Sequence, residues 1–251
     1  MKNYKKKYLA RLQKDFNEVR ENNALYVGRR CLHCYEPLNE LHTEVHQACN
    51  KRFYGQLKTP QLHYNLDNLQ ELATQVIQSQ MAVTGVQAKV SLSLYRKADK
   101  NLTKKLTIVG LYGDYILKPP SEFYPQLPEL ESVTMHMASV CGLQVVPNSL
   151  VRLQDDTLCY ITKRVDRTRK GKLQMEDMCQ LSERLTEDKY KGSHEQVAKL
   201  LLKYSSNPLL DVSSFFELVL FSFFTGNADM HLKNFLIFVF CICNTTYIDT
   251  F

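Results

Sequence analysis

Long hydrophobic runs are missing from this sequence of 251 residues. No segment reaches the roughly 20 consecutive apolar residues that a membrane-spanning helix needs. No apolar stretch follows the lysine-rich start, as it would in a signal peptide. We therefore expect a cytoplasmic protein without a membrane partner. Internal repeats and low-complexity linkers are missing too, so nothing in the sequence indicates a repeat protein.

A strong charge of one sign is also missing. The net charge is +6, and much of the positive excess lies near the start, at Lys2, Lys5, Lys6, Lys7, Arg11 and Lys14. This basic start fits an acidic partner or the solvated face of a helix, and its apolar spacing predicts one amphipathic helix within residues 1–25. The hydrophobic content of 44% predicts a folded chain of one large domain or two smaller ones.

Eight cysteines are present, and in a reducing cytoplasm they are not expected to form disulfides. Four residues follow a metal-binding spacing: Cys31 and Cys34 form a CxxC pair, and His46 and Cys49 form an HxxC pair. Three thiolates and one imidazole predict a closed tetrahedral zinc site, which would be structural or partner-binding because no coordination position stays open for substrate. The alternative is a small loop with ordinary reduced cysteines.

Hydrophobic periodicity divides the rest of the chain into strands followed by helices. The predicted strands are residues 90–94, 107–111, 115–117, 145–153 and 157–165. The predicted helices are residues 129–141, 194–204 and 211–225. The first helix has apolar positions at Leu130, Val133, Met137 and Val140, and the last is apolar on nearly all sides, which predicts that it is buried.

This order predicts an α+β fold in which an antiparallel-sheet lobe precedes a helical lobe, with the small zinc-binding module in front of both. We place the three domains at residues 1–58, 59–170 and 171–251. A cleft between two lobes is a natural place for a ligand.

Two short motifs could approach a phosphate. The segment TGVQAK at residues 84–89 puts Gly85 and Lys89 at a strand boundary, where backbone amides and a lysine can contact an anion. One glycine is not the repeated pattern of a dinucleotide-binding loop or a P-loop, so a plain β-turn is the alternative. Lys118 closes the apolar strand before two prolines, which fits either a cleft-facing charge or a lysine that reaches solvent at a strand end.

The sharpest motif is GNADMHLKNF at residues 226–235, directly after the apolar run 215–224. It places Asn234 five residues after Asp229, an arrangement that phosphoryl transfer uses: the aspartate orients the attacking hydroxyl and the asparagine holds Mg²⁺. The alternative is that Asp229 caps a helix.

Taken together, the motifs resemble the HipA family of toxin serine/threonine protein kinases, which belong to bacterial toxin-antitoxin pairs. The matching segments are TGVQAK at 84–89, ILKPP at 116–120, LPELESVTMHMA at 127–138, KRVDR at 163–167, MEDMCQ at 175–180 and GNADMHLKNF at 226–235. The resemblance implies a protein-kinase-like bilobal fold, ATP and Mg²⁺ as cofactors, and transfer of phosphate to a cytosolic protein.

The resemblance also implies residue roles. Gly85, Val86, Gln87 and Lys89 match the loop over the ATP phosphates, and Lys118 matches the phosphate-contacting lysine, with Glu131 as its pairing glutamate. Asp229 matches the catalytic aspartate and Asn234 a Mg²⁺ ligand, flanked by His231 and Lys233 in the same loop. A second Mg²⁺-binding aspartate is usual in the family, and Asp249 is the acidic residue available for it.

Several departures from the family pattern shape the functional hypotheses. The sequence stops at Phe251, soon after the catalytic loop, which predicts an incomplete helical lobe, and the Cys/His module stands where longer members have another subdomain. The implied partners are a protein substrate, such as a translation component, and a helix-turn-helix antitoxin that would connect the chain to DNA indirectly. The alternatives are an inactive remnant that binds the antitoxin and a zinc-stapled nucleic-acid-binding protein.

Overall fold

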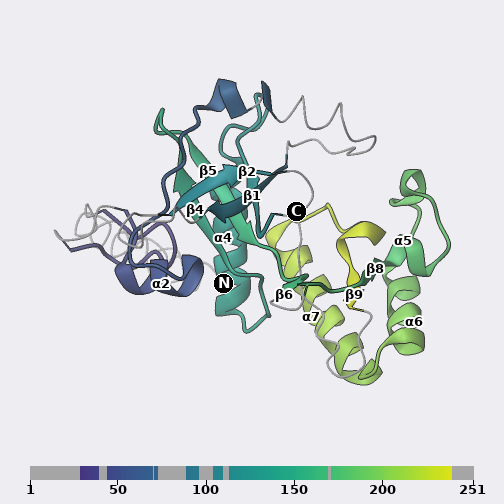
Figure 1. Cartoon of the computed structure of the whole chain (residues 1–251). Coiled ribbons are helices and arrows are strands. Elements are labelled where there is room, and N and C mark those ends of the chain that lie inside the picture. The colour runs from purple at the N-terminus through teal and green to yellow at the C-terminus, as the bar shows by residue number, and fades with distance from the viewer. Residues whose placement is uncertain are drawn as a thin grey trace, which may run out of the picture.

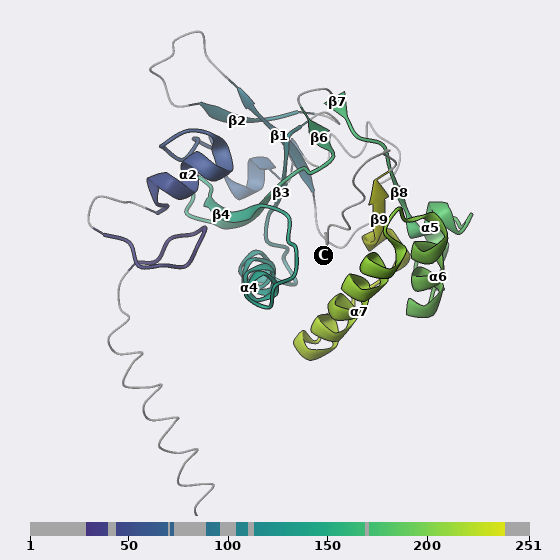
Figure 2. The same ribbon diagram turned by 90° about the horizontal axis from the view of Figure 1, so that it is seen from below.

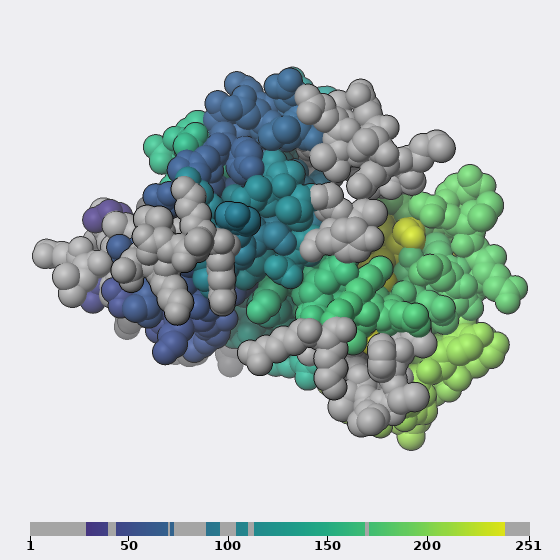
Figure 3. Space-filling model, viewed as in Figure 1, coloured from purple at the N-terminus to yellow at the C-terminus, as the bar shows by residue number. Residues whose placement is uncertain are grey.

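The computed structural model describes residues 29–39, 44–69, 71–72, 89–95, 104–109, 113–168 and 171–238. The helix predicted within residues 1–25 lies outside them. Figure 1 shows the Cys/His module and the C-terminal helical part on opposite sides of a central sheet. Figure 3 shows the same order on the surface, from purple and blue through teal to green.

The main sheet has five strands within these residues. They are β1 (Val90–Tyr95), β2 (Lys105–Ile108), β3 (Tyr115–Lys118), β4 (Asn148–Arg152) and β5 (Leu158–Lys163). Their order is β2-β1-β3-β5-β4, and every neighbouring pair is antiparallel. The predicted hairpin across residues 154–156 is therefore confirmed, with Val151 opposite Cys159. Alternation of side chains along the strands places Leu92, Leu117 and Ile161 in one core.

Helix α4 (Leu127–Val140) packs on β4 and β5 (Figure 2). It ends before Gly142, which has a φ of 84° and so takes the left-handed conformation expected of a C-terminal stop. The predicted apolar face is wrong, because Leu130, Val133, Met137 and Val140 are all exposed. The buried face of α4 instead carries Glu131, Ser132, Met135 and Ala138. Glu131 and Ser132 can be buried because Lys118 and Tyr35 form hydrogen bonds with them.

The Cys/His module shares the core of the sheet. Helix α2 (Gln47–Tyr54) buries Phe53 and Tyr54 against Tyr115 of β3, with ring centroids 5.6 and 5.8 Å from the Tyr115 ring. On the other side of the module, the backbone N–H of Leu150 in β4 donates to the carbonyl of Leu32. The module is therefore attached to the sheet at two places.

The C-terminal part is mainly helical. Its elements are β6 (Arg167–Thr168), β7 (Gly171–Lys172), β8 (Met175–Asp177), α5 (Met178–Leu181), η1 (Thr186–Asp188), α6 (His194–Tyr204), α7 (Pro208–Thr225), η2 (Leu232–Asn234) and β9 (Leu236–Phe238). Strands β8 and β9 pair in antiparallel fashion, which brings the two ends of this part together. Its core is formed by Met178, Cys179, Val197, Leu201, Phe215, Leu218, Leu232, Phe235 and Ile237.

Helix α7 was expected to be buried on nearly all sides, and this expectation is wrong. Phe215 and Leu218 face α6 and the core, but large side chains on the remaining surface are exposed: Leu209, Leu210, Phe216, Leu220, Phe223 and Phe224. By length and composition alone, α7 is the one described helix that could cross a membrane, a criterion that core helices of soluble proteins also meet. The described neighbours cover one face of the helix only.

Candidate functional site

Lys118 and Glu131 form a buried ion pair. Lys118 ends β3, where Leu117 anchors the strand in the core, and Glu131 lies on the first turns of α4. The Nζ atom of Lys118 is 2.7 Å from Oε1 of Glu131, and both side chains are at most 3% exposed. The ammonium group also lies 5.4 Å from the centroid of the Tyr160 ring, within cation–π range. The fold thus compensates the lysine charge and holds it in one place.

The loop that follows α7 is fixed at both ends. Gly226 has a φ of 71° and caps α7, which allows the chain to turn sharply away from the helix. The side-chain amide nitrogen of Asn234 donates to the carbonyl of Asp229, and this bond closes the loop. The amide oxygen of Asn234 is left as the atom that can face a cation.

The carboxylate of Asp229 does not cap a helix. Its Oδ1 accepts a hydrogen bond of 3.3 Å from the hydroxyl of Tyr190, and its side chain is 46% exposed. The residue at the N-cap position of the short helix η2 is His231, whose side chain makes no capping hydrogen bond. The helix-cap alternative is therefore wrong, and the carboxylate remains accessible.

His231 packs beside Asp229. Its Nε2 lies 3.7 Å from Oδ1 of Asp229, and its ring meets the Tyr190 ring edge-on at 5.0 Å. Burial lowers the pKa of His231 below 6.5, Asp229 raises it, and the positive charges of Lys189 and Lys89 lower it further. The lowered pKa favours the neutral form of the imidazole. Lys89, whose charge contributes to this shift, directly precedes β1.

The side chains of Lys233 and Asp229 have different partners. The Nζ atom of Lys233 lies 2.6 Å from Oδ2 of Asp177, the N-cap residue of α5. Asp177 also accepts a hydrogen bond from the backbone N–H of Gln180, as in a capping box. Lys233 therefore attaches the loop to α5. Sequence reasoning missed Asp177, although an aspartate just before a helix is a recognisable cap, and it had no signal for Tyr190.

The four predicted metal ligands lie together. The ligand atoms of Cys31, Cys34, His46 and Cys49 are all within 4.8 Å of one another, close enough to hold one tetrahedral ion. The Nε2 atom of His46 is 3.1 Å from the carbonyl of Pro37. If Nε2 carries the proton, Nδ1, which is 3.4 Å from Sγ of Cys34, offers its lone pair to the ion.

The thiols of this cluster have shifted acidities. Burial opposes ionisation of Cys31, but backbone N–H groups of His46, Cys34 and His33 donate to its sulfur and lower its pKa. Burial and the neighbouring sulfurs raise the pKa of Cys49 to about 12. A divalent cation is the group that would allow all three thiols to ionise together.

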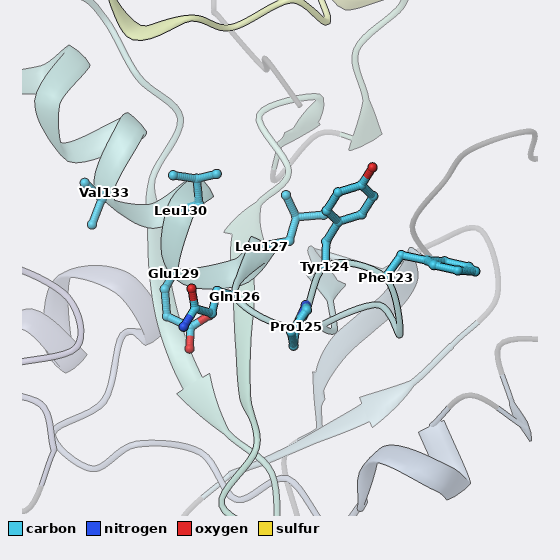
Figure 4. A pocket seen from close by; sticks show the side chains of 8 residues that line it. All are labelled: Phe123, Tyr124, Pro125, Gln126, Leu127, Glu129, Leu130 and Val133. Carbon is cyan, nitrogen blue, oxygen red and sulfur yellow. The ribbon is translucent and has the colours of Figure 1, made fainter.

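Other predicted site residues lie outside the described residues: Gly85, Val86, Gln87 and Asp249. A groove of about 560 Å³ lies beside the start of α4 (Figure 4). It is lined by Phe123, Tyr124, Pro125, Gln126, Leu127, Glu129, Leu130 and Val133. This mainly apolar groove includes none of the residues predicted to contact ATP.

Similarity to known proteins agrees with this architecture. Residues 81–244 match the family model described as HipA-like C-terminal domain. A Haemophilus influenzae protein named "Putative kinase" is 30% identical over 199 residues, which cover 69% of this chain and 56% of that protein. "Putative kinase Y4dM" of Sinorhizobium fredii is 32% identical over 167 residues, covering 61% of this chain and 39% of that protein.

A solved structure shows the same fold. It is that of the Shewanella oneidensis toxin-antitoxin protein HipA, in complex with HipB and operator DNA, with a TM-score of 0.50 and 22% identity. The match covers 71% of this chain and 49% of that chain, so this chain spans about half the length of the relatives it matches. The predicted kinase-like α+β fold is confirmed. With about two thirds of its residues matched by the family model, this chain belongs to the HipA-like C-terminal domain family.

Proposed function

We propose that this chain is an ATP-dependent serine/threonine protein kinase of the HipA toxin type. The observation that supports it best is the buried Lys118–Glu131 pair, with Nζ and Oε1 2.7 Å apart, between a sheet strand and the helix packed on that sheet. Protein kinases use such a pair to hold a lysine against the nucleotide phosphates. The names of two relatives, "Putative kinase" and "Putative kinase Y4dM", agree with this function.

The residues present fit MgATP. Lys118 would contact the phosphates, oriented by Glu131, and the free amide oxygen of Asn234 would bind Mg²⁺, which neutralises developing charge on the phosphates when bound. The exposed carboxylate of Asp229 would orient the hydroxyl of the substrate and accept its proton.

Several implied roles belong to the same proposal. Gly85, Val86, Gln87 and Lys89 would cover the phosphates, and Asp249 would be the second Mg²⁺ ligand. Lys89 is exposed, and its charge reaches His231 of the catalytic loop, which fits a place near the phosphates.

The proposed partners are a cytosolic protein substrate, such as a translation component, and a helix-turn-helix antitoxin. The Shewanella HipA was solved with HipB and operator DNA, and we extend to this chain a partner of the same kind, which would bring it to DNA indirectly. Co-elution of the purified chain with a candidate helix-turn-helix protein from the same genome tests this partner. Separate elution of the two at micromolar concentration counts against it.

The kinase proposal is tested by calorimetric titration with MgATP and by phosphate release. We expect Lys118→Met and Asn234→Ala to abolish both signals. Lys199→Met is the matched control, because Lys199 is 70% exposed on α6, lies outside the motif segments that resemble the family and should leave both signals unchanged. Absence of nucleotide binding by the folded wild-type chain would refute the proposal. Binding without turnover would favour the inactive, antitoxin-binding alternative.

A further inference from the structure

The Cys/His cluster is connected to α4 by one side chain. Tyr35 directly follows Cys34, and its backbone N–H donates to the carbonyl of Cys31, which closes the metal-binding turn. Its φ of 61° is a left-handed conformation that a tyrosine rarely adopts. This conformation belongs to the turn that carries the two cysteines, so the direction of the Tyr35 side chain depends on that turn.

The far end of Tyr35 reaches the buried face of α4. Its hydroxyl donates to Oγ of Ser132 at 2.7 Å, and its ring meets the His136 ring edge-on at 4.9 Å. Ser132 is 2% exposed and follows Glu131, the partner of Lys118. A tyrosine of the metal-binding turn therefore holds α4 next to the residue that positions the phosphate-contacting lysine.

Leu32 provides a second connection from the same turn. Its carbonyl accepts hydrogen bonds from the backbone N–H of Leu150 and from Oγ of Ser149 in β4. Its side chain packs both against the buried cysteines and in the small core that contains Met135 of α4 and Tyr160 of β5. The Tyr160 ring in turn lies 5.4 Å from Nζ of Lys118. Glu131 thus adjoins a residue that is bonded to the turn, and Lys118 lies over a ring of the cluster in which Leu32 packs.

The turn has few buried apolar residues of its own. The buried residues of its local cluster are Cys31, Val45 and Cys49, and two of these three are metal ligands. A segment with so small a core usually needs a metal or a disulfide to fold. In such modules the free energy of metal binding is also the free energy of folding.

We propose that a zinc ion bound by Cys31, Cys34, His46 and Cys49 acts through Tyr35 and Leu32 as a brace on α4, which couples zinc binding to nucleotide binding at Lys118. The nucleotide-binding part of this inference rests on the proposed kinase function, whereas the zinc-binding part does not. Tyr35 is a positioning residue in it, because it acts through Ser132 and α4 and touches no substrate.

The coupling predicts a reciprocal effect that can be measured on the full chain. Zinc affinity is determined by chelator competition with and without a saturating non-hydrolysable ATP analogue plus Mg²⁺, and the zinc content is determined by mass spectrometry. We expect one zinc per chain, and a zinc affinity that rises about 5-fold or more when the nucleotide is present. Nucleotide affinity should rise by the same factor when zinc is present, because linkage is reciprocal.

Tyr35→Phe separates the brace from the metal site itself. It keeps the ring and all four ligands but removes the hydroxyl that donates to Ser132, so zinc content should stay at one per chain. Nucleotide binding should weaken by about 3- to 10-fold, the effect of one lost buried hydrogen bond. Ser132→Ala should have the same effect, and the double variant should be no weaker than either single one. Tyr204→Phe, at an exposed tyrosine on α6, is the matched control.

The possible failures can be told apart. Nucleotide binding by the wild type with equal zinc affinity in both conditions would overturn the brace and leave the kinase proposal intact. Equal nucleotide affinity of Tyr35→Phe and Tyr204→Phe would also overturn the brace and leave the kinase proposal intact. This holds even if the zinc-free protein does not fold. A chain that holds no zinc would overturn the metal site. A zinc-loaded, folded chain that binds no nucleotide would overturn the kinase proposal and the coupling together.

Discussion

The buried pair of Lys118 and Glu131 makes a quantitative prediction about stability. At a separation of 2.7 Å and an effective dielectric constant of about 20, the attraction of the two charges is about 6 kcal/mol. Part of this is offset by the cost of removing both groups from water. Removal of one member breaks the ion pair and leaves the other charge buried, which typically costs about 3–5 kcal/mol.

We therefore expect Lys118→Met and Glu131→Leu each to lower the free energy of unfolding by about 3–5 kcal/mol, a large part of the usual total of about 5–15 kcal/mol. The double variant replaces the pair by two apolar side chains of similar size. It should be much more stable than the sum of the two single changes predicts, since no buried charge remains.

Urea unfolding of the four proteins, followed by circular dichroism, measures this coupling. Nucleotide binding should be lost in all three variants, so the double variant would be folded but unable to bind. Strictly additive losses of stability in the double variant would show that the two charges do not depend on each other, and the argument from the buried pair would be wrong.

Three further predictions concern the sheet and the loop that follows α7. Gly113→Ala should destabilise the sheet by about 1–3 kcal/mol in thermal unfolding, because a Cβ atom would lie 2.6 Å from the carbonyl of Leu92. Lys233→Met should cost about 1–2 kcal/mol, less than the fully buried pair, because Lys233 is about one-third exposed beside Asp177. Stability should fall as the pH drops below 6.5 toward the lowered pKa of His231, since the unfolded chain takes up the proton first. His231→Gln should show a smaller acid-side fall in melting temperature.

Local patterns were enough to predict the strands of the main sheet, but not the short strands β6 to β9 or the orientation of α4. The hairpin of β4 and β5 follows from alternating side chains on both sides of a short polar turn, all within about 20 residues. The periodicity of α4 instead indicated Leu130 and Val133 as its inner face, and the structure exposes both. Burial of Glu131 and Ser132 depends on Lys118 and on Tyr35, which is 97 residues away from Ser132, and no local pattern contains that information.

In the candidate site, too, local patterns could identify residues close in sequence but not their distant partners. Asp229 and Asn234 are five residues apart and share a loop that their own hydrogen bond closes, so spacing alone could identify them. Asp177 lies 56 residues before its partner Lys233, and Tyr190 lies 39 residues before its partner Asp229. These supporting residues become visible only when β8 and β9 pair and bring the segments together.

The position of α4 depends on polar contacts more than is usual for a helix packed on a sheet. Its most apolar stripe, which includes Met137 and Val140, faces away from the described core and contributes little to its attachment. Adjacent positions on a helix point about 100° apart, so Glu131 and Ser132 hold α4 from two directions, one toward β3 and one toward Tyr35. Hydrogen bonds in two different directions fix the rotation of α4 about its axis more tightly than the apolar contacts of Met135 and Ala138 would alone. A change in the metal-binding turn should therefore rotate α4 before it unfolds the sheet, and nucleotide affinity should respond before overall stability does.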